Sequence, residues 1–267
     1  MRTLIPIGGN IDKKEPLALI EFVKRAGGRK AKIIIFPQAS SLKDTGKKYT
    51  ALFNTLGAGS VESLEFSKRA EVNQPRFLES IRKASGVFIC GGNQMRIPIL
   101  ISGTPIEQEL IKAYQRGCVI SGTSAGAAVL SKTMIAYGKS GSTPREGIAQ
   151  FFPGIGFTDK FIFDQHFRQR DRLGRLIYAI SICPGALGVG VDENTAAIIE
   201  NESSITVAGS GAVTIVDGNQ ITATDAADIQ NQNPIAVSNL IVHVLTHGCV
   251  YHGSTNKVSI PKKQSLS

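Results

Sequence analysis

A serine lies between two glycines in the segment Gly-Thr-Ser-Ala-Gly at residues 122–126. The segment follows the apolar run 118–121 and precedes a helix-compatible stretch. Strand, tight turn and helix form the context in which a G-x-S-x-G sequence presents a nucleophile. Ser124 is therefore a candidate nucleophile, and the N–H of Ala125 at the helix start is a candidate oxyanion donor. The alternative is a glycine-rich turn that carries a surface serine.

A nucleophilic serine requires a base, and the chain has four histidines. His166 follows the apolar run 161–163, so at a strand end it could reach a nucleophile on a neighbouring strand. The alternative for His166 is a hydrogen-bonded core histidine. The remaining three histidines lie in a β-branched segment interrupted by Gly248, where a helical pair of metal ligands is poorly supported: His243, His247 and His252. We therefore predict no metal site.

Three carboxylates are candidates for the group that holds the histidine in the required tautomer. Asp164 lies two residues before His166, whereas Asp192 and Glu193 end a glycine-bearing strand. The spacing alone does not choose between them.

A second glycine turn follows the apolar run 87–90. Its glycines, Gly91 and Gly92, allow backbone N–H groups to approach a ligand closely, which suits the other half of an oxyanion hole. A tight turn between a strand and a helix explains them equally well. The first turn, Gly8-Gly9, lacks the third glycine of a dinucleotide fingerprint. We therefore predict no nucleotide cofactor, and no other cofactor.

Four arginines crowd within eight residues beside His166: Arg168, Arg170, Arg172 and Arg175. Arginine captures carboxylates in bidentate pairs, so the cluster predicts a pocket for a substrate with acidic groups. The alternative is a solvated basic helix face. The formal net charge is +9, but the other lysines and arginines are scattered and are not interleaved with aromatic residues. We therefore do not predict a nucleic-acid partner.

Apolar strands alternate with helical patterns over the first 130 residues. Strands are expected at 3–7, 32–36, 61–66, 87–90 and 118–121, and helices at 16–26, 47–56, 74–84 and 104–116. This alternation predicts a three-layer α/β/α arrangement, in which helices cover both faces of a mainly parallel sheet. Further strands are expected at 204–208, 212–217 and 239–244.

The length of 267 residues and the absence of a Pro- or Ser-rich linker predict one domain. We expect a core over about 1–217 and a β-rich C-terminal extension over about 218–267. The four cysteines are widely spaced, which argues against a zinc ribbon or a disulfide scaffold and fits a cytoplasmic protein. No apolar run approaches the roughly 20 residues that span a bilayer, and no signal peptide is evident. We therefore predict no membrane association.

Several of these motifs occur together in the order seen in the cyanophycinases, a group of serine peptidases related to the aspartyl dipeptidases. The chain resembles them from about residue 3 to about residue 217. The matching segments are Gly8-Gly9, Arg25-Ala-Gly-Gly28, Pro37-Gln-Ala-Ser40, Gly91-Gly-Asn-Gln94 with Arg96-Ile97, Gly122-Thr-Ser-Ala-Gly126, Asp164-Gln-His-Phe167, Gly174-Arg-Leu176 and Asp192-Glu-Asn-Thr195. The chain departs from the family pattern at Asn93, where Asp is frequent, and in the first turn, where members often carry an acid sooner.

This resemblance implies a class I glutamine-amidotransferase-like (flavodoxin-like) fold and a cytoplasmic homodimer without metal or cofactor. The implied activity is exopeptidase cleavage of cyanophycin, a poly-aspartate backbone with arginine linked through each β-carboxyl, into β-Asp-Arg dipeptides. The implied triad is Ser124, His166 and Glu193, with Gly92 and Ala125 as oxyanion donors. The positions that match the family's substrate pocket are Gln94, Asp164, Gln165, Arg170, Arg172 and Arg175.

The chain order of serine, histidine and acid argues against an ordinary α/β-hydrolase, which places the acid before a late histidine. Only Asp225 or Asp228 with one of the three C-terminal histidines would serve in that arrangement. Two further functions are compatible with the implied fold. One is that of an aspartyl or isoaspartyl dipeptidase acting on short peptides, and the second is that of a catalytically silent binder of acidic peptides.

Overall fold

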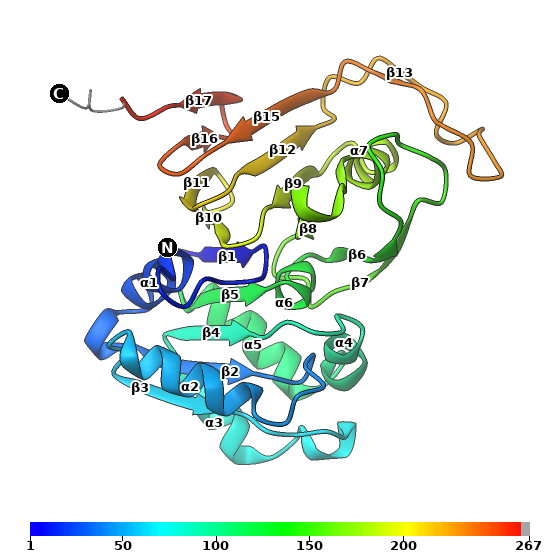
Figure 1. Ribbon diagram of the computed structural model, residues 1–267. Helices are drawn as coiled ribbons and strands as arrows, with labels where there is room; N and C mark the ends of the chain where they lie inside the picture. The colour runs from blue at the N-terminus through cyan, green and yellow to red at the C-terminus, as the bar shows by residue number, and fades with distance from the viewer. Residues whose placement is uncertain (263–267) are drawn as a thin grey trace.

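Five parallel strands form one half of the central sheet in the computed structural model, which describes residues 1–262 (Figure 1). Residues 263–267 at the end of the predicted extension lie outside the described residues. The strands follow the order β1 (Thr3–Ile7), β5 (Val119–Thr123), β4 (Gly86–Ile89), β2 (Lys32–Phe36) and β3 (Ser60–Ser63). Every residue of β1, β4 and β5 is buried, as expected of parallel strands that are covered on both faces.

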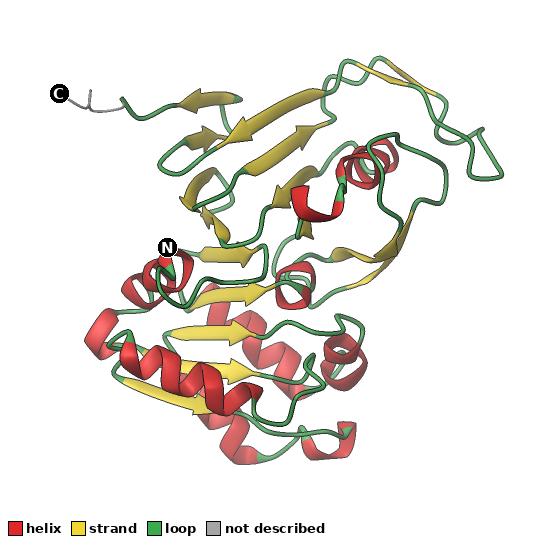
Figure 2. Cartoon of the chain, viewed as in Figure 1, coloured by secondary structure: helices red, strands yellow, loops and turns green. Residues whose placement is uncertain are grey.

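Helices cover both faces of this parallel half (Figure 2). Phe88 of β4 packs in one apolar cluster with helices α1 (Leu17–Arg25) and α2 (Thr45–Thr55). Its neighbour Val87 packs in another cluster with α3 (Pro75–Lys83), α4 (Arg96–Ile101) and α5 (Pro105–Gln115). Alternate strand residues point to opposite faces, so the two clusters form two separate helical layers. Short 3₁₀ turns lie at Gly28–Lys30 and Arg69–Glu71.

The other half of the central sheet is antiparallel. It continues from β1 through β10 (Thr195–Glu200), β11 (Ser204–Gly209), β16 (Val250–His252) and β17 (Lys257–Ser259). A second sheet has the order β15 (Ile241–Leu245), β12 (Val213–Asp217), β9 (Leu187–Val191) and β8 (Phe161–Gln165), with β8 and β9 parallel. Helix α7 (Leu173–Ile182) packs on this second sheet.

The C-terminal strands belong to the same two sheets as the strands that precede them. The sequence places the end of the core near residue 217, yet β12 pairs with β15 and β11 pairs with β16 across that point. The structure also has two separate two-stranded antiparallel sheets. One pairs β6 (Thr133–Gly138) with β7 (Ala149–Pro153), and the other pairs β13 (Ala223–Thr224) with β14 (Val237–Ser238). None of the helices within residues 1–262 is both long and apolar enough to cross a bilayer.

The carboxyl ends of strands from both sheets meet at one place. Backbone hydrogen bonds join the turn after β1 to the turns after β8 and β9, because Gly8 O accepts from the N–H of His166 (2.8 Å) and Gly9 O accepts from that of Asn194 (2.9 Å). The carboxyl ends of parallel strands are where ligand sites form in open α/β sheets. The sheets therefore bring residues of distant segments together at this edge.

Candidate active site

Ser124 occupies the sharp turn between β5 and the single-turn helix α6 (Ala125–Ala128). Its backbone has φ +52° and ψ −117°, and its N–H donates to Ile7 O at 2.9 Å. A Cβ added at Gly122 would lie 2.1 Å from Gly126 O, and one added at Gly126 would lie 2.0 Å from Ile89 O. The turn therefore requires both glycines. This geometry is the nucleophile elbow that the sequence predicts.

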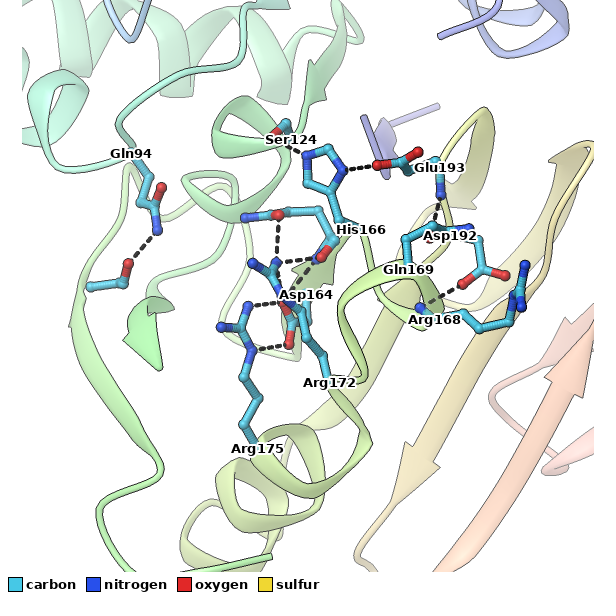
Figure 3. Close-up of polar contacts among 12 residues, drawn as sticks. Gln94, Ser124, Asp164, His166, Arg168, Gln169, Arg172, Arg175, Asp192 and Glu193 are labelled. Carbon is cyan, nitrogen blue, oxygen red and sulfur yellow. Dashed lines mark hydrogen bonds and ion pairs between the residues drawn. The ribbon is translucent and has the colours of Figure 1, made fainter. Parts of the chain in front are cut away.

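Ser124, His166 and Glu193 form a continuous hydrogen-bonded chain (Figure 3). Ser124 Oγ lies 2.8 Å from His166 Nε2, and His166 Nδ1 lies 2.6 Å from Glu193 Oε1. With Nδ1–H donated to the carboxylate, Nε2 is free to accept the proton of the serine hydroxyl. The three side chains come from the ends of β5, β8 and β9, which converge at this edge of the sheets.

The backbone of the first turn fixes the position of the imidazole. His166 lies in the left-handed region with φ +48° and is only 8% exposed. A Cβ added at Gly9, whose φ is +102°, would lie 2.4 Å from His166 Cε1. The Gly8-Gly9 turn, for which the sequence predicts no nucleotide, thus packs directly against the imidazole of His166.

Two polar side chains that the sequence does not single out hold Glu193. Asn10 Nδ2 donates to Glu193 Oε2 at 2.8 Å, and Gln169 Oε1 accepts from the N–H of Glu193 at 3.1 Å. The hydrogen bond from Asn10, and after it that from His166, lowers the pKa of Glu193 below its ordinary value. The carboxylate therefore stays ionised beside the histidine. The one sequence signal for Asn10 is its place directly after a glycine turn at a strand end.

Burial makes the imidazole a base at neutral pH. Desolvation is the largest effect on His166 and lowers its pKa, and the positive charges of Arg170 and Arg172 act in the same direction. The hydrogen bond to Glu193 opposes this shift but does not reverse it. The net result is a pKa below the ordinary value of 6.5, so His166 is neutral near pH 7.

We expect the acid limb of the kcat/KM profile to fall below pH 6.5, since protonated His166 cannot accept the serine proton. Activity is then full above this limb and is lost as the pH drops through the pKa of His166. Rates measured between about pH 4 and 8 test the position. Asn10→Asp places a second negative charge beside Glu193, which favours protonated His166 and moves the limb to higher pH.

The exposed Asn54 on α2 offers a matched control, because Asn54→Asp adds the same charge on a helix with no contact to the triad. The acid limb of Asn54→Asp should coincide with that of the unmodified enzyme. An acid limb above pH 6.5 in the unmodified enzyme, or an unchanged limb in Asn10→Asp, would contradict the assignment.

Of the predicted oxyanion donors, Ala125 directly follows Ser124, and Gly92 belongs to the turn after β4. A Cβ added at Gly91 would lie 3.1 Å from Ser124 Cβ, so the turn after β4 lies directly against Ser124. Within residues 1–262, the N–H of Gly92 and that of Ala125 donate to no protein acceptor, whereas those of Cys90 and Asn93 are bonded to backbone carbonyls. Both N–H groups are available to a ligand, and their role as donors stays a prediction.

Four of the predicted substrate-binding residues contact one another in a buried network. Arg175 Nε donates to Asp164 Oδ2 at 2.6 Å, and Arg172 Nη1 lies 3.2 Å from Asp164 Oδ1 and 2.7 Å from Gln165 Oε1. Asp164 is 1% exposed. Burial lowers the pKa of Arg172 to about 10, so Arg172 remains charged at neutral pH. Asp164 thus gives both arginines a structural role that the sequence did not predict, and their contact with substrate stays a prediction.

The other residues predicted to bind substrate or to orient the histidine are either exposed or hydrogen-bonded to the backbone. Arg170 is exposed on the 3₁₀ turn Arg168–Arg170, which directly follows His166 and Phe167. Gln94 donates through Nε2 to Ala136 O. Asp192 accepts from the N–H of Arg168 and from that of Ala212, each at 3.0 Å. Both carboxylate oxygens of Asp192 are thus occupied by backbone N–H donors. Of the three candidate carboxylates, Glu193 is the one that contacts His166.

The C-terminal histidines do not join the site. His247 Nδ1 accepts from the N–H of Gly209 at 3.3 Å, and His252 Nε2 lies 3.0 Å from Ser259 Oγ. The ring of His243 packs 5.4 Å from that of Tyr251. The described part of the chain holds no group of three or more His, Cys, Asp or Glu side chains arranged to bind a metal.

Comparisons with known proteins place the chain in a peptidase family. A model of peptidase family S51 matches residues 4–207. The cyanophycinase of Trichormus variabilis is 39% identical over 253 residues, which cover 93% of this chain and 85% of the relative. The cyanophycinase of Synechococcus elongatus is 38% identical over 258 residues, which cover 96% of this chain and 80% of the relative.

Solved structures confirm the predicted fold. A peptidase from an acI-B1 Actinobacterium superposes with a TM-score of 0.61 at 21% identity, over 91% of this chain and 97% of that chain. A putative peptidase E from Listeria monocytogenes EGD-e superposes with a TM-score of 0.55 at 14% identity, over 79% of this chain and 100% of that chain. The shared architecture is an α/β fold with a parallel central sheet, to which this chain adds C-terminal antiparallel strands.

Proposed function

Because the chain belongs to peptidase family S51 and is a serine peptidase, we propose that it is a cyanophycinase that releases β-Asp-Arg dipeptides from cyanophycin. The observation that carries the proposal is the 39% identity to a cyanophycinase over 93% of the chain. The Ser124–His166–Glu193 network supplies the chemistry that such a hydrolysis requires.

The reaction proceeds in two steps through an acyl-enzyme. His166 takes the proton from Ser124 Oγ, and the oxygen attacks the backbone carbonyl near the C-terminus of the polymer. The N–H groups of Ala125 and Gly92 stabilise the tetrahedral oxyanion, and the loss of one such donor typically costs about 10²- to 10³-fold in rate. His166 then protonates the leaving amine, and water attacks the acyl-enzyme by the same route and restores the serine.

Positive charge beside His166 favours a substrate that carries free carboxylates, as each unit of cyanophycin does. Arg170 is exposed there, while Arg172 and Arg175 are held below the surface by Asp164. Gln94, which Figure 3 shows near Ser124, and Gln165, which accepts from Arg172 Nη1, complete the proposed pocket. A homodimer and a cytoplasmic location stay predictions from the resemblance.

We expect incubation with purified cyanophycin to yield β-Asp-Arg as the main small product, identified by mass spectrometry against synthetic α- and β-linked standards. The same preparation should hydrolyse free α-Asp-X and β-Asp-X dipeptides far more slowly. The reverse preference would make the protein an aspartyl or isoaspartyl dipeptidase. Binding of the polymer without any product would leave a catalytically silent binder.

A further inference from the structure

A charged cavity of about 530 Å³ lies between two loops beyond the arginine segment. One wall is the loop after β6, over residues 139–146, and another is formed by Asp171 and by Gln232 of the β13–β14 arm. Its volume lies within the range of small-molecule binding sites. The walls carry charges of both signs, which are Lys139, Arg145, Glu146 and Asp171.

Short backbone connections place this cavity next to the catalytic base. The N–H of Arg170 donates to His166 O at 3.0 Å, so a single turn leads from the base to the next residue, Asp171. Asp171 O in turn accepts from the N–H of Gly141 at 2.7 Å, which ties the loop after β6 to this turn. An extended ligand that leaves the site along the arginine segment therefore reaches the cavity.

The four charges are not neutralised by one another. Within residues 1–262, none of the four side chains forms an ion pair, and the carboxylate of Asp171 accepts no hydrogen bond. Gln232 holds three of them, because Lys139 Nζ donates to its Oε1 (2.5 Å), Arg145 Nη1 to its backbone O (3.4 Å), and its N–H to Glu146 Oε2 (3.1 Å). Charges of both signs thus face the cavity with only neutral partners.

We propose that this cavity binds a further unit of the substrate. It is the unit that directly precedes, along the polymer, the unit whose carbonyl forms the acyl-enzyme. The inference rests on the proposed function, in which each unit carries one arginine with a guanidinium and a free carboxylate. The carboxylates of Asp171 and Glu146 pair with the guanidinium, and Lys139 and Arg145 pair with the carboxylate. A ligand of a single charge would leave half of these groups without a partner.

The test compares substrates of two and four β-Asp-Arg units, since a two-unit substrate has one unit on each side of the cleaved bond and no further unit to reach the cavity. We expect the unmodified enzyme to have a higher kcat/KM for four units. Asp171→Asn keeps the shape and tolerates the φ of +47°. The ratio of the two kcat/KM values should fall about 5- to 20-fold in this variant, because one charge-assisted pair is lost. Asp171→Asn with Arg145→Gln should lower it further.

Asp159→Asn is the matched control, because the exposed Asp159 precedes β8 at the end opposite to His166. Its ratio should equal that of the unmodified enzyme. Equal kcat/KM for two and four units in the unmodified enzyme, or an unchanged ratio in the double variant, would overturn the inference alone. If the unmodified enzyme cleaves neither oligomer, the proposed function falls and this inference falls with it.

Discussion

Ser124→Ala is expected to lower kcat by about 10⁴- to 10⁶-fold, which is the usual cost of removing the nucleophile of a serine triad. The hydroxyl contacts His166 Nε2 at 2.8 Å and is the only group of the triad that forms a bond with substrate carbon in the proposed mechanism. The protein should remain folded, because Ser124 holds the turn through its backbone N–H rather than its side chain. Turnover of cyanophycin and a circular dichroism spectrum measure the two effects separately.

The triad also predicts how its substitutions combine. Ser124→Ala with His166→Ala should be scarcely slower than Ser124→Ala alone, since groups that act as a unit are not additive. Ser254→Ala, at an exposed serine in a distant turn, provides the control and should keep full activity. Retained turnover in Ser124→Ala, or covalent labelling of that variant by a serine-directed reagent at the unmodified rate, would refute the assignment.

Asp164→Asn is expected to lower the free energy of unfolding by about 3–5 kcal/mol, the range found when one partner of a buried ion pair is removed. The substitution keeps the size of the side chain but leaves Arg172 and Arg175 charged and buried without a counter-ion. Their side chains are 9% and 5% exposed, so water does not replace the lost carboxylate. Denaturant-induced unfolding followed by fluorescence or circular dichroism measures the change.

A surface pair provides the comparison for this prediction. Asp44 Oδ2 lies 2.8 Å from Lys48 Nζ, but both side chains are more than half exposed. Asp44→Asn should therefore leave the unfolding midpoint nearly unchanged. Similar midpoints for Asp164→Asn and Asp44→Asn would show that the Asp164 network does not stabilise the fold.

The parts of the site that sequence predicts are those with a local signature. The turn around Ser124 is readable because glycine spacing, the preceding apolar run and the following helix lie within a dozen residues. The helix positions follow for the same reason, and α3 and α5 each begin with a proline, a residue that suits the first position of a helix. Helices α4 and α7 were not among the predicted ranges, and α4 is only six residues long and carries Pro98 in its first turn.

The choice of carboxylate needed the tertiary structure. Asp164, Asp192 and Glu193 all lie at strand ends, and only the pairing of β8 with β9 and the turns that follow these strands decide which of them meets His166. The resemblance to the cyanophycinases, rather than spacing, favoured Glu193. Asn10 was missed because an exposed amide after a glycine turn has many explanations, and its contact spans 183 residues.

The burial of Arg172 and Arg175 has a simple cause, which the alternation of side chains along β8 could have predicted. Ile162 and Asp164 lie on the same face of β8, and Ile162 packs in the cluster of Leu176 on α7. Asp164 must then face the first turn of that helix, where Arg175 lies. A cluster of like charges beside a catalytic histidine therefore needs its possible counter-ions examined before it is assigned to substrate.

The three triad residues come from two sheets, so the active site is complete only while these sheets are packed together. The nucleophile belongs to the central sheet, whereas the base and its carboxylate belong to the second, and the Gly8–His166 and Gly9–Asn194 hydrogen bonds bridge them. Any local opening that parts this seam separates base from nucleophile while each sheet keeps its own ladder of hydrogen bonds. We therefore expect catalytic activity to depend on a cooperative unit smaller than the whole molecule, namely the contact between the two sheets.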